Sequence, residues 1–237
     1  MKDRLRIATW NLEWATPGSD RHTRAIEHLA QFDADIVVTT EDSLHDWSEY
    51  PHRIDGGPDW GYPIRGARRK VIAWSRTPWE GVTELAERAT HGRFVQGTTN
   101  VRGRKVQVLA VCIPWRNAHV KGGRTGREPW GEHVEFCEAL GPAVAEAGGG
   151  PVIVAGDFNQ RIPRVNQPRA VADALGAALV PLRVATADEH AVGRLIDHVA
   201  VSADFAVVDV EAWTNVVDGR RISDHSGVVV TVDLALA

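Results

Sequence analysis

Short runs of Val, Ile, Leu and Ala recur along this chain of 237 residues, and stretches with helical spacing separate several of them. Short apolar runs bounded by turn residues indicate strands, whereas apolar residues that recur at i, i+3 and i+4 indicate an amphipathic helix. The pattern predicts strands at residues 5–12, 35–40, 70–75, 94–101, 105–113, 151–155, 196–202, 206–213 and 227–234. It predicts helices at residues 21–32, 130–147 and 168–178.

The order of these elements favours an α/β fold. Arg102-Gly103-Arg104 separates two predicted strands and is typical of a hairpin turn, whereas helices separate some of the other strands. Such a mixture indicates mixed sheets, and we expect two of them packed face to face with the helices outside. The pattern does not give the strand order. Gly148-Gly149-Gly150 fits a helix end and a turn better than a linker, so residues 1–237 are predicted to form a single domain.

Composition narrows the functional classes. A hydrophobic content of 43% and a charged content of 24% are typical of a globular protein with a sizeable core. The net charge of −4 argues against a protein that coats nucleic acid through a large basic field, but it leaves room for a local basic rim. Cys112 and Cys137 form neither a disulfide framework nor a zinc motif.

The apolar runs are too short for a membrane span of roughly 20 residues. The first run is interrupted by Asn11 and Glu13, which also makes it too short for a signal peptide. We therefore expect a cytoplasmic monomer that does not bind membranes.

Polar side chains interrupt the predicted strands at their ends, and the sharpest case follows the strand at 151–155. There Gly156, which permits a tight turn, precedes a carboxylate at Asp157 and an amide at Asn159. On an extended segment, residues i and i+2 point the same way, so the two side chains would face one point in space. A simple Asx-rich turn is the alternative.

Four other strand ends carry similar groups. Asn11 closes the first strand and Glu41 follows the second, where a turn role and an exit to solvent are the ordinary explanations. Asp197 enters an apolar strand, and because a buried carboxylate needs a partner we expect it to orient a basic group. Asp224-His225 places an oxygen ligand beside a titratable imidazole just before the last strand.

This order of motifs, from Asn11 and Glu41 through Gly156-Asp157-Phe158-Asn159 and Asp197 to Ser223-Asp224-His225, resembles the endonuclease/exonuclease/phosphatase superfamily. The resemblance extends from Thr9 to Val230, and the Gly-Asp-x-Asn and Ser-Asp-His segments are its most specific parts. It implies a four-layered α/β sandwich and hydrolysis of phosphoester bonds that depends on Mg²⁺ or Mn²⁺.

The resemblance also implies roles for these residues. Glu41 would be the chief metal ligand, with Asn11 close by and Asp224 a further contributor. Magnesium fits such a set, because it prefers oxygen ligands and keeps several waters.

For the reaction itself, the resemblance implies that Asp157 positions and deprotonates the attacking water and that Asn159 holds the phosphate or the nucleophile. His225 would contact the scissile phosphate, with its imidazole fixed by Asp197. The sequence leaves open whether Asp157 or His225 is the general base.

Two departures from the family pattern stand out. Many members place a phosphate-contacting His after the strand that corresponds to 106–113, but this chain reads Cys112-Ile113-Pro114-Trp115 there. His119 lies a few residues further on and could substitute, although we expect an ordinary surface histidine. Thr40 stands where Gln often precedes the metal ligand, which matters little.

Basic and aromatic residues near the motifs suggest a substrate-binding rim. Arg161 closely follows Asn159, and Arg220 and Arg221 closely precede Asp224, so we expect these arginines to bind phosphates. Core packing is the commoner use of Trp. Trp115 and Trp130, however, bracket a basic segment and are our candidates for stacking on bases.

Three functions compete on this basis. The first is a nuclease or repair-type phosphodiesterase that acts on nucleic acid, and the rim suits a single-stranded or end-bearing substrate as well as a small aromatic phosphoester. The second is a phosphatase or phosphodiesterase that acts on a small metabolite or a lipid head group. The third is a non-catalytic binding module, suggested by the missing His but opposed by the intact set of acidic, amide and imidazole side chains.

Overall fold

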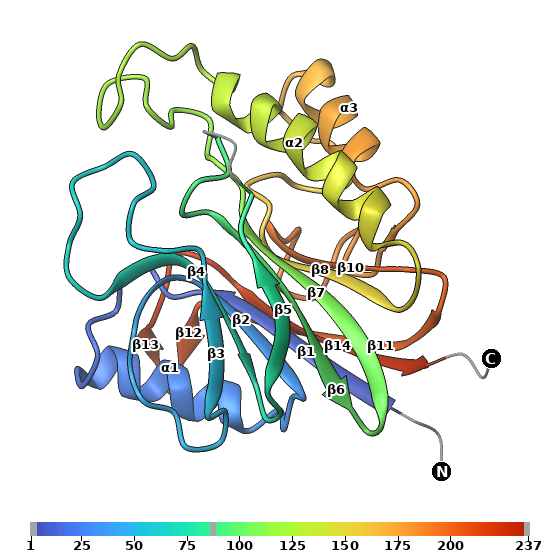
Figure 1. Ribbon diagram of the computed structural model, residues 1–237. Coiled ribbons are helices and arrows are strands. Elements are labelled where there is room, and N and C mark those ends of the chain that lie inside the picture. The colour runs from blue at the N-terminus through green and yellow to red at the C-terminus, as the bar shows by residue number, and fades with distance from the viewer. Residues whose placement is uncertain (1–3, 86–88, 235–237) are drawn as a thin grey trace.

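Two six-stranded sheets pack face to face in the computed structural model, which describes residues 4–85 and 89–234. Helix α1 (Asp20–Ala30) covers the outer face of one sheet. Helices α2 (Gly131–Ala147) and α3 (Arg169–Ala178) cover the outer face of the other (Figure 1). The predicted four-layered α/β sandwich is confirmed.

The first sheet contains both chain ends of the described structure. Its strand order is β11 (Phe205–Trp213), β14 (Gly227–Leu234), β1 (Arg4–Asn11), β2 (Ile36–Ser43), β4 (Arg68–Ser75) and β3 (His52–Asp55). Only β1 and β2 run parallel, and every other neighbouring pair in this sheet is antiparallel. The ends of β1 and β2 therefore reach the same edge of the sheet.

The second sheet has the same mixed character. Its order is β5 (Trp79–Thr83), β6 (Phe94–Val101), β7 (Arg104–Cys112), β8 (Val152–Asp157), β10 (Asp197–Val201) and β9 (Arg183–Val184). Strands β6 and β7 form the predicted hairpin, and β7 pairs in parallel with β8 after the crossover through α2. A separate two-stranded ribbon consists of β12 (Val216–Val217) and β13 (Arg220–Arg221).

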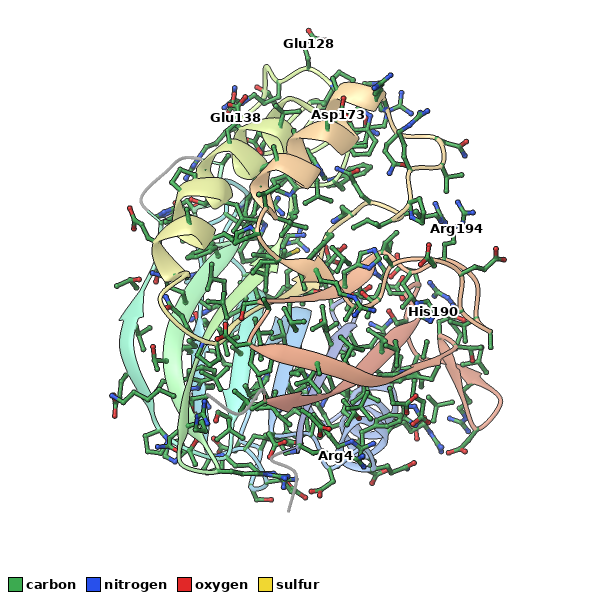
Figure 2. All side chains as sticks on the ribbon, turned by 90° about the vertical axis from the view of Figure 1, so that its right-hand side faces the viewer. Arg4, Glu128, Glu138, Asp173, His190 and Arg194 are labelled. Carbon is green, nitrogen blue, oxygen red and sulfur yellow. The ribbon has the colours of Figure 1, made fainter. Side chains whose placement is uncertain are left out.

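Side-chain alternation builds the core in three layers. On β1, Leu5 and Ile7 face the second sheet, whereas Ala8 and Trp10 face α1. The outer layer on the second sheet is filled by apolar side chains of α2 and α3, and Figure 2 shows these helices side by side with Glu138 and Asp173 on their exposed sides. Within residues 4–85 and 89–234, none of the helices combines the length and the apolar character that a membrane crossing needs.

The predicted helices and longer strands agree with the structure to within a few residues. The stretch that begins at Gly148 ends α2, as predicted. The sequence pattern missed β3, β5, β9, β12 and β13, which are short and lie at sheet edges or in the small ribbon. Their side chains are largely exposed or half-buried, so they lack the apolar run that identifies a buried strand.

Candidate active site

The five polar motifs identified in the sequence meet at one edge of the sandwich, although Glu41 lies inside β2 and not after it as predicted. Asn11 at the end of β1 donates from Nδ2 to Asp157 Oδ2 at the end of β8, over 3.1 Å, and so joins the two sheets. Asp157 is also the register partner of Asp197, the first residue of β10. The Ser223–His225 segment is tied to β1, because Ser223 Oγ donates to the Asn11 carbonyl over 2.6 Å.

Asp157 is 2% exposed and accepts hydrogen bonds on both of its oxygens. The Asn159 backbone donates to Oδ1 over 2.8 Å, and the Asn159 amide donates to Oδ2 over 2.9 Å and also to the Ile113 carbonyl. Asn159 adopts a φ of 52°. The predicted convergence is therefore confirmed, but the expected extended geometry is wrong, because an Asx turn and a left-handed Asn159 bring the groups together.

Gly156 is required by a close backbone approach rather than by a turn. Its φ is +139°, and a Cβ at this position would overlap the carbonyl of Val111 on β7. Only glycine allows β7 and β8 to pair so closely here. Asp157 is thus held by the sheet itself.

Asp197 and His225 form a buried pair. Asp197 is fully buried, and its Oδ2 lies 2.5 Å from His225 Nδ1, which confirms the expectation that this carboxylate orients a basic group. The His225 backbone N–H donates to Ser223 Oγ over 3.0 Å. The other ring nitrogen, Nε2, lies 3.8 Å from Asp224 Oδ1.

These contacts strongly perturb the acid–base groups. Burial raises the pKa of Asp157 to about 7, although the charge of His225 opposes the rise. Burial likewise raises the pKa of Asp197, again against His225. Burial disfavours the charged imidazole of His225, but Asp197 and Asp157 outweigh it and raise the pKa to about 10. At neutral pH the cluster therefore contains a cationic imidazole beside a carboxyl group near its midpoint.

Glu41 lies at the same edge, beside the end of β1. Its backbone has a φ of 49°, its side chain is 23% exposed, and Oε1 lies 2.5 Å from Lys70 Nζ. A non-glycine residue in this region stores strain, and such strain often occurs at functional sites. Lys70 was not among the predicted site residues, because its burial depends on the pairing of β2 with β4, which the pattern does not give. Asp224 is half-exposed beside His225.

The expectation that His119 is a surface histidine is wrong. Its side chain is buried, because Gly61 and Gly123 leave space for the ring between them. The ring stacks on Tyr62 with centroids 4.4 Å apart, and its Nδ1 forms a short contact with Glu132. These contacts hold His119 within the loops that follow β7.

The predicted arginines do not all lie at the site. Arg161 is exposed and lines a hollow of about 360 Å³ together with Asn159, Arg116 and Trp130. Trp130 and Arg116 therefore lie beside Asn159.

Arg220 and Arg221 are already engaged in exposed ion pairs. Arg220 pairs with Asp20 at the start of α1, over 2.7 Å. Arg221 pairs with Glu13 over 3.1 Å, and the Glu13 backbone donates to Asn11 Oδ1. Only Arg221 is thus linked to the site by a short chain of contacts.

Trp115 is 48% exposed and lines a second hollow, of about 290 Å³, on the Glu41 side of the site. Lys70, the partner of Glu41, also lines it. Trp14 and Trp60 stack against each other in its wall, with ring centroids 5.4 Å apart. Two hollows with aromatic and basic walls therefore flank the cluster of acidic, amide and imidazole side chains.

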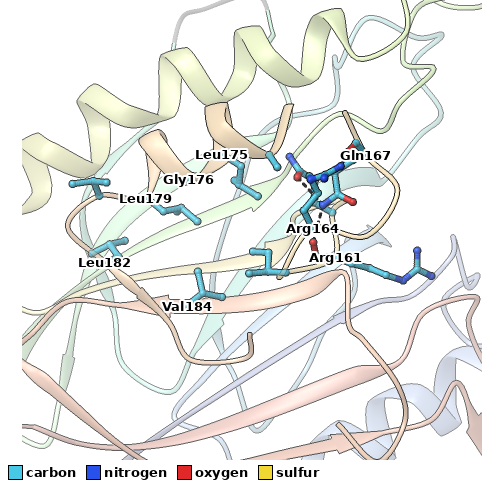
Figure 3. A pocket seen from close by; sticks show the side chains of 12 residues that line it. Arg161, Arg164, Gln167, Leu175, Gly176, Leu179, Leu182 and Val184 are labelled. Atoms are coloured by element: carbon cyan, nitrogen blue, oxygen red, sulfur yellow. Dashed lines mark hydrogen bonds between the residues drawn. The ribbon is translucent and has the colours of Figure 1, made fainter. Parts of the chain in front are cut away.

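A further cavity of about 270 Å³ lies between α3 and β9 (Figure 3). Leu175, Leu179 and Leu182 line it, whereas the guanidinium of Arg161 extends away from these leucines. None of its lining residues is acidic. This cavity therefore offers no carboxylate to a metal ion or to acid–base chemistry.

Two groups of side chains in the described structure have ligand atoms close enough to hold a metal ion. One consists of Asp157, Asp197 and His225. The other consists of His22, Asp42 and His45, which lie between α1 and β2.

The sequence matches the model of the Endonuclease/Exonuclease/phosphatase family over residues 8–225. A search of curated proteins gave no match. Among solved structures, an endonuclease/exonuclease/phosphatase from Beutenbergia cavernae DSM 12333 is 20% identical, with a TM-score of 0.69 over 98% of this chain and 72% of that chain.

Two further solved structures cover 98% of this chain and 100% of their own. An AP endonuclease from Archaeoglobus fulgidus is 16% identical with a TM-score of 0.70. A variant of the 3′ phosphatase NExo from Neisseria, bound to a product DNA hairpin, is 19% identical with a TM-score of 0.68. These likenesses show a shared fold.

Proposed function

Because the chain belongs to the endonuclease/exonuclease/phosphatase family, it is a phosphoesterase, and we propose that it hydrolyses phosphodiester bonds in nucleic acid with Mg²⁺ or Mn²⁺. The observation that carries this proposal is the buried cluster at the joint edge of the two sheets. Asp157, with its pKa raised to about 7, lies there beside two amide donors and the Asp197–His225 pair. A group with a pKa near the working pH is suited to proton transfer.

The donor set at the open side of the cluster fits a hard divalent cation. Glu41 and Asp224 offer partly exposed carboxylates, and Asn11 offers an amide oxygen. Mg²⁺ and Mn²⁺ favour such oxygen ligands, and Mg²⁺ needs only one or two carboxylates. The Asp157, Asp197 and His225 group fits less well, because its imidazole is cationic and already bonded to Asp197. When bound, the ion supplies positive charge that stabilises the phosphoryl and leaving oxygens.

The other roles in the reaction are assigned to side chains of this protein. Asp157 accepts the proton of the attacking water, and the amides of Asn11 and Asn159 fix the orientation of its carboxylate. His225, held by Asp197, presents the cationic side of its ring to the scissile phosphate. Lys70 holds Glu41 in position for the ion.

The flanking hollows favour nucleic acid as the substrate. Arg161 and Arg116 supply charge for phosphates on one side, and Trp130 and Trp115 supply surfaces on which bases can stack. A small phosphomonoester is the second candidate. It is favoured by the likeness to the Neisseria protein, a 3′ phosphatase with the same fold.

The test compares the chain with its Asp157→Ala variant on bis(p-nitrophenyl) phosphate, plasmid, single-stranded oligonucleotide and a panel of phosphomonoesters. We expect turnover that requires Mg²⁺ or Mn²⁺ and falls at least about 100-fold in the variant, because general acid–base catalysis contributes about 10² to 10⁴. Circular dichroism should show the variant folded. Asp173→Ala, which removes an exposed carboxylate on α3, is the matched control.

Two results would count against the proposal. Undiminished turnover by Asp157→Ala, or in excess chelator, rejects the assigned chemistry. Hydrolysis restricted to phosphomonoesters rejects nucleic acid as the substrate and favours the second candidate.

A further inference from the structure

Arg93, one residue before β6, is a buried guanidinium without a counter-ion in the described structure. The residue is 2% exposed, and its Nη2 has no hydrogen-bond partner. No ion pair among residues 4–85 and 89–234 includes Arg93. A buried charge is unfavourable unless it is paired, so this side chain lacks the partner that its position requires.

The space beside Arg93 is the 290 Å³ hollow on the Glu41 side of the site. Arg65, Arg68 and Lys70 also line it, and none of its lining residues is acidic. Among these four cations, the described structure gives only Lys70 a carboxylate partner, because Glu41 lies 2.5 Å from its Nζ. The hollow therefore carries a surplus of positive charge at the point where it meets the proposed metal ligand.

The walls of this hollow are aromatic and rigid. Trp14 stacks on Trp60, and the charged groups of Arg68 and Lys70 lie 4.9 Å and 5.1 Å from the centre of the Trp14 ring. Such cation–π contacts fix both cations in place. Trp115 forms the exposed part of the wall, where a flat ring can stack.

We propose that this pocket, defined by Arg93, Arg65, Arg68, Lys70 and Trp115, binds a second phosphate of the substrate, next to the scissile one. The proposal rests on the proposed function, because the pocket adjoins the same site. A phosphate satisfies the unpaired guanidinium, which can bind it through two parallel hydrogen bonds. The base attached to that phosphate stacks on Trp115. The substrate class is thus a nucleic-acid end or oligonucleotide with a phosphate beside the cleaved bond.

The first experiment measures anion binding without turnover. Inorganic phosphate is added to the metal-free protein in excess chelator, and thermal unfolding is followed. We expect the midpoint of the wild type to rise by several degrees, because a ligand that binds only the folded state stabilises it. Arg93→Met, which removes the buried charge, should be no less stable than the wild type without phosphate and should show no rise with it. Arg183→Met, an exposed arginine on β9, is the control and should respond like the wild type.

The second experiment measures substrate choice. Cleavage of the dinucleotide TpT is compared with cleavage of the same dinucleotide phosphorylated at its 5′ or 3′ end, with bis(p-nitrophenyl) phosphate as the substrate that has a single phosphate. We expect one phosphorylated dinucleotide to have a KM at least about tenfold below that of TpT in the wild type. Arg93→Met should lose this preference, whereas Arg183→Met, the exposed control on β9, should keep it.

The outcomes separate this pocket from the proposed function. An equal response to phosphate in the wild type and Arg93→Met, or equal KM values for the three dinucleotides in the wild type, overturns the second-phosphate pocket. Phosphate stabilisation that depends on Arg93, without metal-dependent turnover of any substrate, overturns the proposed function and supports the pocket. If Arg93→Met does not fold, the pocket is tested by sulfate inhibition of the wild type alone. Sulfate should then inhibit cleavage of the preferred dinucleotide more strongly than that of bis(p-nitrophenyl) phosphate, and equal inhibition overturns the pocket.

Discussion

Replacing Asp197 with Asn tests how the buried pair sets the charge of His225. The amide is nearly the same size as the carboxylate and its oxygen can still accept the bond from Nδ1, so the ring should stay in place. The charge, however, is lost. The rise of the His225 pKa from 6.5 to about 10 corresponds to roughly 5 kcal/mol in favour of the imidazolium, and Asp197 contributes most to that rise.

Without Asp197, burial dominates and we expect the pKa of His225 to fall below 7. The ring should then be neutral at pH 7.5 and contribute little to binding a phosphate. At this pH the kcat of the variant for bis(p-nitrophenyl) phosphate should be about 10² to 10⁴ below that of the wild type, and the ratio of the two values should narrow below pH 6, where His225 is protonated in both proteins. Steady-state kinetics between pH 5.5 and 9 measure this directly.

The folded-state titration gives an independent readout without metal. In the wild type, the imidazole of His225 should keep its proton between about pH 6 and 8.5, whereas in Asp197→Asn it should lose that proton within this range, which the ring ¹⁵N shifts in NMR report. Because the folded pKa of His225 is raised, its contribution to stability is complete below 6.5 and is lost as the pH rises through about 10. The free energy of unfolding, measured in urea, should therefore decrease less between pH 7 and pH 9.5 in the variant than in the wild type.

Asp209→Asn, on the exposed face of β11, is the matched control and should behave like the wild type. If Asp197→Asn retains the wild-type kcat and leaves the His225 titration unchanged, then Asp197 does not set the charge of the ring. The interpretation of this cluster would then be wrong.

Three further predictions follow from other features. Gly156→Ala should lower the free energy of unfolding by about 3 kcal/mol or more in urea titrations, because its Cβ would overlap the Val111 carbonyl; a change below about 1 kcal/mol contradicts the packing account. Burial lowers the pKa of His133 to about 4, so this residue should lower the free energy of unfolding by about 2 kcal/mol when the pH falls from 7 to 5. His133→Gln should show a smaller decrease over the same range, and an equal decrease in the two proteins refutes the assignment. Glu41→Gln should raise the Mn²⁺ concentration for half-maximal activity at least about tenfold, and an unchanged metal titration would remove Glu41 from the ligand set.

The sequence predicted the layers and most of the site because both depend on local patterns. Apolar runs mark the buried strands, and a polar group at the end of such a run marks the edge where Asp157 and Asn11 meet. The order of the strands depends on long-range pairing, which local pattern does not encode. For that reason the partnership of Glu41 with Lys70, which needs β2 beside β4, was not predicted.

The errors have similar causes. His119 is buried between Gly123, which is close to it in the sequence, and Gly61, which is distant, so its burial depends on a long-range contact that local pattern does not show. Arg220 was expected at the site because it is close to Asp224 in sequence, but the small ribbon carries it to α1 and Asp20. Arg93 stands between turn residues and an apolar strand, where an exposed arginine would be ordinary. Only the fold reveals its missing partner.

The contact between Asn11 and Asp157, and that between Asp197 and His225, each join one sheet to the other. The chemistry thus depends on how the two halves of the sandwich are seated, and a shift of about 1 Å between them can separate the reacting groups. Substitutions deep in the layer between the sheets, far from any phosphate, should weaken turnover before they unfold the chain. Activity would then report on the packing between the two sheets, and a loss of activity in such a variant would not identify a residue that touches the substrate.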